Sequence, residues 1–153
     1  MFFRGISKVS VDAKGRFSLP KQRREHLQAS GVNTVVVTAD PGRCLLIYPM
    51  SEWQKFEAQI VALPNAHPAA RQYQRLYLGY AAEIEFDSSG RLLLTSELRD
   101  YANIDRKATL LGQGNKLEMW NADVFDEQAE KWADDLNGLP ADEVPEFIQG
   151  LTI

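Results

Sequence analysis

The sequence has few of the residues that build disulfides and metal sites. It contains one cysteine and two histidines among 153 residues. The single Cys44 cannot form an internal disulfide, which is consistent with a reducing compartment. Neither His26 nor His67 has Cys, Asp or Glu at the spacing of metal ligands. We therefore expect no metal ion and no cofactor, and we expect Cys44, which precedes Leu45-Leu46-Ile47, to be a small buried apolar residue.

Long apolar runs are also absent, and so are the marks of a secretion signal. No stretch of about 18 apolar residues occurs, so no membrane-spanning helix is expected. The first residues, Met1-Phe-Phe-Arg-Gly-Ile, contain neither an apolar core segment nor a small-residue cleavage site, which argues against export. The sequence thus favours a cytoplasmic protein without a membrane partner.

Catalytic motifs are missing as well. The chain has no Gly-x-Ser-x-Gly, no phosphate-binding Gly-Lys-Ser/Thr loop and no histidine beside an evident nucleophile. Its acidic residues are spread along what we expect to be exposed helix faces, and they are not paired for acid–base catalysis. We predict that the protein is not an enzyme and has no small-molecule substrate.

One short motif, in contrast, occurs twice. Asp12-Ala-Lys-Gly-Arg-Phe-Ser-Leu is matched 75 positions later, without a gap, by Asp87-Ser-Ser-Gly-Arg-Leu-Leu-Leu. The copies share the Asp, the Gly, the Arg, the next apolar residue and the Leu, and Arg24 aligns with Arg99. Such self-similarity at a fixed displacement indicates two related structural units in tandem.

The first copy has the pattern of a β-hairpin, because polar and apolar residues alternate before and after its turn, and the second copy follows the first. In the turn, Asp12 and Asp87 can accept hydrogen bonds from the backbone, while Gly15 and Gly90 supply a positive φ. The expected hairpin strands cover 7–11, 16–19, 83–86 and 91–94.

The rest of the chain alternates between short strands and helices. Ser51 and Gln54 fit a capping box, with Ser51 as the N-cap of a helix that Pro64 ends. Strands are expected over 33–38, 44–48, 108–111 and 116–120, and helices over about 21–28, 51–63, 68–78, 96–102 and 121–136.

Charge is distributed unevenly along the chain. Residues 1–30 carry seven Lys and Arg against two Asp and Glu, whereas residues 121–153 carry nine Asp and Glu against one Lys. This polarity is compatible with a surface that faces a polyanion and with an acidic far side. It is also compatible with two solvated faces, which the charges alone slightly favour.

The arginine of the repeated motif needs a separate explanation. A purely structural hairpin turn accounts for its Asp and Gly, but turn geometry requires no cation after the Gly. We predict that Arg16 and Arg91 contact DNA, by bidentate pairing to guanine where they reach the major groove. Asp12 and Asp87 are expected to fix the turns or orient these arginines, since a free carboxylate facing phosphate would be repelled. Expected phosphate contacts are Lys14, Arg4 and Lys8. Arg24 and Arg99 could be further contacts, but we favour pairing of both with nearby Glu or Asp.

Several motifs together resemble the MraZ transcriptional regulators. They are Phe3-Arg4-Gly5, the paired Asp-x-x-Gly-Arg turns, Leu46-Ile47-Tyr48-Pro49-x-x-x-Trp53 and Arg75-Leu-Tyr-Leu-Gly79, and the resemblance covers roughly residues 3–136. It implies an α+β, β-rich fold, in which two SpoVT-AbrB-type swapped-hairpin repeats form a double-split β-barrel with peripheral helices. The family's DNA-contacting Asp-x-x-x-Arg motif would fall on Asp12 and Arg16 and on Asp87 and Arg91.

The resemblance also implies a biological role. Members of this family are cytoplasmic, associate with the nucleoid and form ring-like homo-oligomers. They bind G-rich direct repeats in double-stranded promoter DNA of the division and cell-wall gene cluster, and they control their own expression. We accordingly expect a repressor. The alternative is an antitoxin-like module that binds a protein through its acidic tail, although two fused repeats weigh against it.

The expected division of the chain follows from the repeat. The first SpoVT-AbrB-like repeat would cover 5–51, a helical connector pair 52–80, the second repeat 81–124, and a C-terminal helix with the acidic tail 125–153. The two copies differ where Lys14 faces Ser89 and where Pro20 faces Thr95 in the alignment. Because its loop is more basic, we expect the first copy to bind DNA more strongly.

Overall fold

The computed structural model describes residues 3–29 and 31–152, and it separates into two compact units at residues 122 and 123. The strands are β1 (Ile6–Ser10), β2 (Arg16–Ser18), β3 (Thr34–Ala39), β4 (Leu45–Pro49), β5 (Ala82–Glu85), β6 (Arg91–Leu93), β7 (Lys107–Gly112) and β8 (Leu117–Asn121). The helices are α1 (Lys21–Gln28), α2 (Met50–Val61), α3 (Pro68–Tyr77), α4 (Ser96–Ala102), α5 (Ala122–Asn137) and α6 (Glu146–Gln149), with a 3-10 helix, η1 (Ala141–Glu143).

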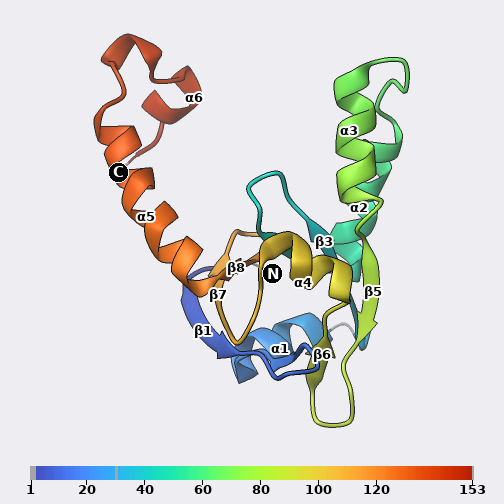
Figure 1. The fold of residues 1–153 in the computed structure, drawn as a ribbon. Coiled ribbons are helices and arrows are strands. Elements are labelled where there is room, and N and C mark those ends of the chain that lie inside the picture. Colours follow the sequence, from blue (N-terminus) through green and yellow to red (C-terminus); the bar gives the residue numbers. More distant parts are fainter. Residues whose placement is uncertain (1–2, 30, 153) are drawn as a thin grey trace. The chain divides into compact units, whose positions relative to one another are not determined.

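Six of the strands in the first unit form one antiparallel sheet, in the order β1-β7-β8-β4-β3-β5 (Figure 1). The order interleaves the two halves of the chain. β1 pairs with β7 from the second half, and β5 from the second half pairs with β3 from the first. Neither repeat therefore completes a sheet alone, and the expected mixed α+β fold with a large share of strand is confirmed.

The expected β-hairpins are wrong beyond their turns, because β1 and β5 pair with β7 and β3 and not with the return strands. The two return strands, β2 and β6, form a separate two-stranded ribbon. β2 and β6 pair antiparallel, with Phe17 opposite Leu92, Arg16 opposite Leu93 and Ser18 opposite Arg91. Phe17 and Leu92 are fully buried and face the core. The ribbon thus brings together the two copies of the motif, which lie 75 positions apart in the sequence.

The sheet is open among the strands that the structure describes, with β1 and β5 as its two edges. No closed barrel is formed by the hydrogen bonds of these strands. The double-split β-barrel implied by the family resemblance stays a prediction, and so does the division of the chain into four segments.

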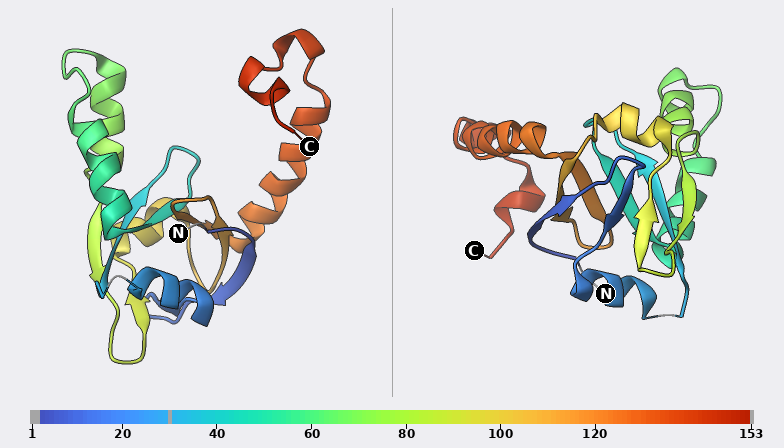
Figure 2. Two further views of the ribbon diagram at one scale, coloured as in Figure 1. Left: turned by 180° about the vertical axis from the view of Figure 1, so that it is seen from behind. Right: turned by 60° about the horizontal axis from the view of Figure 1, so that its bottom comes forward.

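The central strands are covered on both faces. Every residue of β4 is buried, as are all residues of β3 after Thr34. One face contributes Val35, Val37 and Ile47 to the main core. Beyond the other face, α2 and α3 run side by side and extend away from the sheet (Figure 2). Burial of Cys44 inside the structure raises the pKa of its thiol, as expected for a small apolar residue rather than a nucleophile.

The start of α2 differs from the expected capping box. The helix begins at Met50, and its N-cap is Pro49, so Ser51 already lies inside the first turn. The expected Ser51 cap is wrong because Pro49, with φ −58°, can lead directly into the helix without a side-chain cap. α3 does begin at Pro68 as expected, and the Nδ1 atom of His67 accepts a hydrogen bond from the Ala69 N–H at its start.

The second unit consists of α5 and the short helices that follow it. Phe125 and Trp132, about two turns apart on α5, pack edge to face with ring centroids 5.7 Å apart. In the described part of the chain, no helix combines the length and the apolar character needed to cross a membrane.

Candidate nucleic-acid interface

The first turn (residues 12–16) is built around the carboxylate of Asp12. Its Oδ1 accepts hydrogen bonds from the backbone N–H of Lys14 at 3.0 Å and of Arg16 at 2.8 Å. Its Oδ2 accepts one from Nε of Arg16 at 2.8 Å. Gly15 has φ +94°, which a residue with a side chain adopts only with strain. One carboxylate therefore holds both the turn and the arginine that leaves it.

The second turn (residues 87–91) repeats this arrangement. Oδ1 of Asp87 accepts from the N–H of Ser89 at 2.9 Å and of Arg91 at 2.8 Å, and Oδ2 accepts from Nε of Arg91 at 3.0 Å. Gly90 also has a positive φ, +77°. The shared Asp, Gly and Arg of the motif thus have the same geometric roles in both copies.

These contacts fix the ionisation of the two carboxylates. The hydrogen bond from the Arg16 backbone, followed by those from its side chain, lowers the pKa of Asp12 to about 2. The pKa of Asp87 is lowered in the same way, first by the backbone N–H of Arg91. Both carboxylates are therefore ionised at neutral pH, and both are occupied by their own turns.

The two arginines keep one edge of the guanidinium group available. Asp12 and Asp87 take only the Nε–H groups. Within the described residues, no hydrogen bond or ion pair uses the terminal nitrogens of Arg16 or Arg91. The side chains are about one-third exposed, at 31% and 35%. Each turn thus presents a cation whose direction is set by its own Asp.

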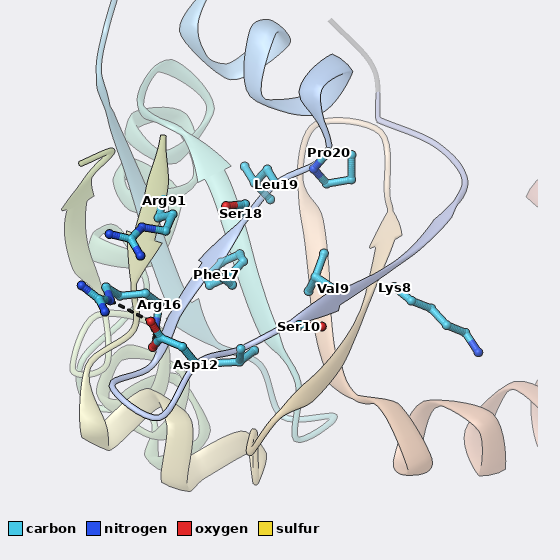
Figure 3. Close-up of a pocket in the computed structure, with 11 residues that line it drawn as sticks. Lys8, Val9, Ser10, Asp12, Arg16, Phe17, Ser18, Leu19, Pro20 and Arg91 are labelled. Atoms are coloured by element: carbon cyan, nitrogen blue, oxygen red, sulfur yellow. Dashed lines mark hydrogen bonds and ion pairs between the residues drawn. The ribbon is translucent and has the colours of Figure 1, made fainter. Parts of the chain in front are cut away.

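Arg16 and Arg91 line a common groove of about 530 Å³ along the β2–β6 ribbon. Figure 3 shows both side chains on the same side, with the Asp12–Arg16 ion pair beside them, whereas the Lys8 side chain extends away. The polar residues of this groove are Lys8, Ser10, Asp12, Arg16, Ser18 and Arg91. Of the five cations expected to contact DNA, the structure therefore brings Arg16 and Arg91 together, while Lys8 lines the groove and points away from them.

The other two expected contacts lie elsewhere. Lys14 is exposed within the first turn, two residues before Arg16. Arg4 lines a different cavity, of about 390 Å³, together with Arg23 and His26. Arg23 is buried and donates hydrogen bonds to the Gly5 carbonyl at 3.0 Å and to Oγ of Ser7 at 3.3 Å. The structure thus separates Arg4 from the groove that holds Arg16 and Arg91.

The expected pairing of Arg24 and Arg99 with nearby carboxylates is wrong. In the part of the chain described, neither forms an ion pair with Asp or Glu, and Arg99 instead donates to the backbone carbonyls of Ala13 and Asp105. Each arginine lies against the turn of the other repeat, where a glycine leaves room for it. Their alignment in the two copies was the available signal, but it could not show which surface they cover.

No sequence pattern singled out Ser18 and Leu93 as candidate DNA contacts. Both lie on the exposed side of the ribbon, and Leu93 is half exposed directly opposite Arg16. On this face, each arginine therefore has a different cross-strand neighbour.

Comparison with known proteins gives a consistent family. Two successive segments, residues 2–76 and 77–142, match the family described as "MraZ protein, putative antitoxin-like". The transcriptional regulator MraZ of Marinomonas sp. (strain MWYL1) is 49% identical over 131 residues, which covers 85% of this chain and 87% of the relative. That of Thiobacillus denitrificans is 40% identical over 151 residues, covering 99% of each chain. That of Hydrogenovibrio crunogenus is 48% identical over 127 residues, covering 82% of this chain and 84% of the relative.

Proposed function

The chain belongs to the MraZ protein family, and we propose that it is a DNA-binding transcriptional regulator whose two Asp-x-x-Gly-Arg turns contact DNA. One observation carries this proposal. Arg16 and Arg91 lie on one groove, each held at Nε by its own Asp, with the terminal nitrogens left over for a ligand.

The geometry of the guanidinium group suits recognition of guanine. Arginine reads the O6 and N7 atoms of guanine with two N–H groups, and such a pair discriminates by about 1–3 kcal/mol. Because Asp12 holds Nε of Arg16 at 2.8 Å, the terminal nitrogens are the pair that can meet a base edge. Less side-chain freedom is then lost on binding. A two-stranded antiparallel ribbon such as β2–β6 also has dimensions that the major groove admits.

Phosphate contacts would be supplied by cations around the ribbon. Lys14 lies beside Arg16 in the first turn, and Lys8 lines the same groove. Arg4 would reach phosphate from its separate cavity, at the margin of the interface. Such contacts release counterions, so affinity should fall as the salt concentration rises. We assign Asp12 and Asp87 to orienting the arginines and not to touching DNA.

Two arginine contacts per protomer support specific but weak binding. Linking several protomers raises the avidity for successive DNA repeats by roughly 10²- to 10⁴-fold. We therefore propose a ring-like homo-oligomer that binds G-rich direct promoter repeats. In this proposal it represses its own gene and the division and cell-wall gene cluster. It would be a cytoplasmic, nucleoid-associated protein that is not an enzyme and needs no cofactor. Its four segments and its double-split barrel belong to the same proposal.

The family description favours a second candidate, an antitoxin-like module that binds a protein. The acidic residues of the C-terminal unit would then face the partner. The presence of two fused repeats, which match the family over residues 2–76 and 77–142, supports the first candidate, because an antitoxin needs only one such repeat.

The test is a fluorescence anisotropy titration of a duplex with G-rich direct repeats at several salt concentrations. Arg16→Ala and Arg91→Ala should each weaken binding by roughly 5- to 150-fold, the equivalent of about 1–3 kcal/mol. Arg71→Ala is a matched control, because Arg71 is exposed on α3 and does not line the groove. Unchanged affinity in both turn variants would refute the proposal, and affinity that is independent of salt would remove the phosphate contacts.

A further inference from the structure

Arg24 and Arg99 are equivalent in the two repeats, and each lies against the turn of the other one. A Cβ atom placed on Gly15 would be 2.9 Å from Cδ of Arg99 and 3.3 Å from its Nη1. A Cβ atom placed on Gly90 would be 2.9 Å from Nη1 of Arg24 and 3.2 Å from its Cδ. The absence of a side chain on each glycine therefore lets the arginine of the opposite repeat lie across the turn.

Polar contacts strengthen this cover at the first turn. Nη1 of Arg99 donates to the carbonyl of Ala13 at 3.4 Å, and the N–H of Leu94 donates to the carbonyl of Gly15 at 3.0 Å. Both donors belong to the second repeat. The first turn is thus held by residues of the second copy in addition to its own Asp12.

The helices that carry these arginines are firmly placed. α4 is anchored by Leu98, which is fully buried, and by the hydroxyl of Tyr101, which donates to the Asp40 carbonyl at 2.6 Å. α1 is anchored by buried Leu27 and by the hydrogen bonds of Arg23 to the segment around β1. Arg24 and Arg99 themselves are half-buried, and in the described chain neither has a carboxylate partner. The aliphatic parts of the Arg24 and Arg99 side chains are therefore held close to Gly90 and Gly15.

We infer that Arg24 and Arg99 are positioning residues that act crosswise: Arg99 fixes the first turn and thereby Arg16, and Arg24 fixes the second turn and thereby Arg91. This inference rests on the proposed DNA contact by Arg16 and Arg91. The placement of Arg16 and of Arg91 then depends on both repeats. The Asp of the same turn sets the direction of the side chain, and the arginine of the other repeat holds the turn itself.

Crossed positioning differs from two simpler roles. If Arg24 and Arg99 only contacted phosphate, their loss would weaken binding independently of Arg16 and Arg91. If they only stabilised the fold, their loss would affect both turns alike. Only the crossed arrangement couples Arg99 to Arg16, and Arg24 to Arg91, without coupling the other two pairs.

Double-mutant cycles on the DNA affinity of the full chain test this pattern. Arg99→Ala should weaken binding roughly tenfold when Arg16 is present and less than about twofold in an Arg16→Ala background, since residues that share an interaction are not additive. The loss of affinity caused by Arg99→Ala should add fully to the loss caused by Arg91→Ala. Arg24→Ala should show the reverse pattern. Additivity with both turn arginines, or equal coupling to both, would overturn the crossed assignment.

A second measurement needs no DNA, so it separates failure of this inference from failure of the proposed function. Amide hydrogen exchange reports on the N–H groups of Lys14 and Arg16, which are bonded to Asp12, and on those of Ser89 and Arg91, which are bonded to Asp87. Arg99→Ala should speed exchange in the first turn roughly tenfold and leave the second unchanged, and Arg24→Ala should do the opposite. Arg99→Lys and Arg24→Lys retain an aliphatic stem and serve where an alanine variant does not fold. An equal change of the exchange rates in both turns of either variant would contradict the inference.

Discussion

The first turn (residues 12–16) and the second turn (residues 87–91) hold their arginines alike but present different neighbours. In both, one carboxylate oxygen accepts from two backbone N–H groups and the other from Nε of the arginine. Around this common core, Lys14 is replaced by Ser89, Ser18 by Leu93 and Pro20 by Thr95. The Asp and Gly are repeated because the turn needs them, the Arg is repeated although the turn does not, and these three differing positions are exposed or begin a helix.

This comparison separates two tasks. The Asp, Gly and Arg build the turn and set the direction of the arginine side chain. We expect the varied positions to change how strongly each turn attracts DNA and how stable the start of the following helix is. The following variants are ordered from the largest expected effect to the smallest.

The largest difference between the two turns should appear when their glycines, Gly15 and Gly90, are replaced by alanine. Gly15 is buried, has φ +94°, and a Cβ there would lie 2.9 Å from Cδ of Arg99 and 3.3 Å from the Leu94 carbonyl. We expect Gly15→Ala to lower the free energy of unfolding by about 2–3 kcal/mol, because it adds backbone strain to a steric conflict. Gly90→Ala should lower it by about 1 kcal/mol, since Gly90 is less buried and the end of Arg24 can move. Urea unfolding checks both, and equal losses would contradict the comparison.

The two helix starts should also differ. The hydroxyl of Thr95 accepts from the Leu98 N–H at 3.2 Å, whereas Pro20 at the start of α1 gives no side-chain cap. Thr95→Ala should therefore lower the free energy of unfolding by about 1 kcal/mol. Pro20→Ala removes no capping bond and should cost about half as much, through the greater freedom of the unfolded chain. Thermal unfolding followed by circular dichroism measures both. A larger loss of stability for Pro20→Ala than for Thr95→Ala would contradict this difference between the two helix starts.

The basic residue in the first turn should govern the salt dependence of DNA binding. Lys14 is exposed, and Ser89 occupies its place in the second turn. If Lys14 contacts one phosphate, Lys14→Ser should reduce the slope of log affinity against log salt by about 0.9, and Ser89→Lys should increase it by a similar amount. The exchange Lys14→Ser with Ser89→Lys should restore the original slope. A slope that stays constant in both single variants would exclude a phosphate contact at this position.

The smallest effect concerns acid stability. In the folded protein the pKa of Asp12 lies at about 2, below its ordinary 3.8, so the folded state binds protons less readily than the unfolded state. The stabilisation is therefore complete above about pH 4 and is lost as the pH falls toward about 2. The pKa of Asp87 is shifted in the same direction. Urea midpoints between pH 6 and pH 2.5 should fall less steeply in Asp12→Asn, and an unchanged pH profile would contradict this role of the carboxylate.

The sequence predicted the local elements well, because periodicity and turn residues act over short distances. The strands and turns around Asp12 and Asp87 and the helix from Ser96 to Ala102 follow from neighbouring residues alone. The expected pairing of the two strands of each hairpin was wrong, because β1 and β5 join the large sheet while β2 and β6 pair with each other. The partners of the strands do not. That β1 pairs with β7, and β5 with β3, depends on contacts between residues far apart in the chain. Local patterns also misplaced the start of α2, where Pro49 took the N-cap position ahead of Ser51.

The candidate site was predictable to a similar degree. Repetition singled out Arg16 and Arg91, because the turn itself does not need a cation. It could not show that Asp12 leaves the terminal nitrogens of Arg16 available, since this depends on a rotamer. Nor could it show that Arg99 covers Gly15, which becomes visible only when the two repeats are folded against each other.

The most direct test of the central claim compares base recognition in charge-preserving variants. Arg16→Lys and Arg91→Lys keep the positive charge but lose the planar fork that pairs with guanine. The quantity to measure is the ratio of affinities for a G-rich repeat duplex and for one in which the guanines are replaced, at constant salt. We predict that each substitution lowers this ratio by roughly 5- to 150-fold while affinity for the replaced duplex stays nearly constant. A ratio unchanged in both variants would show that the two turns do not read guanine.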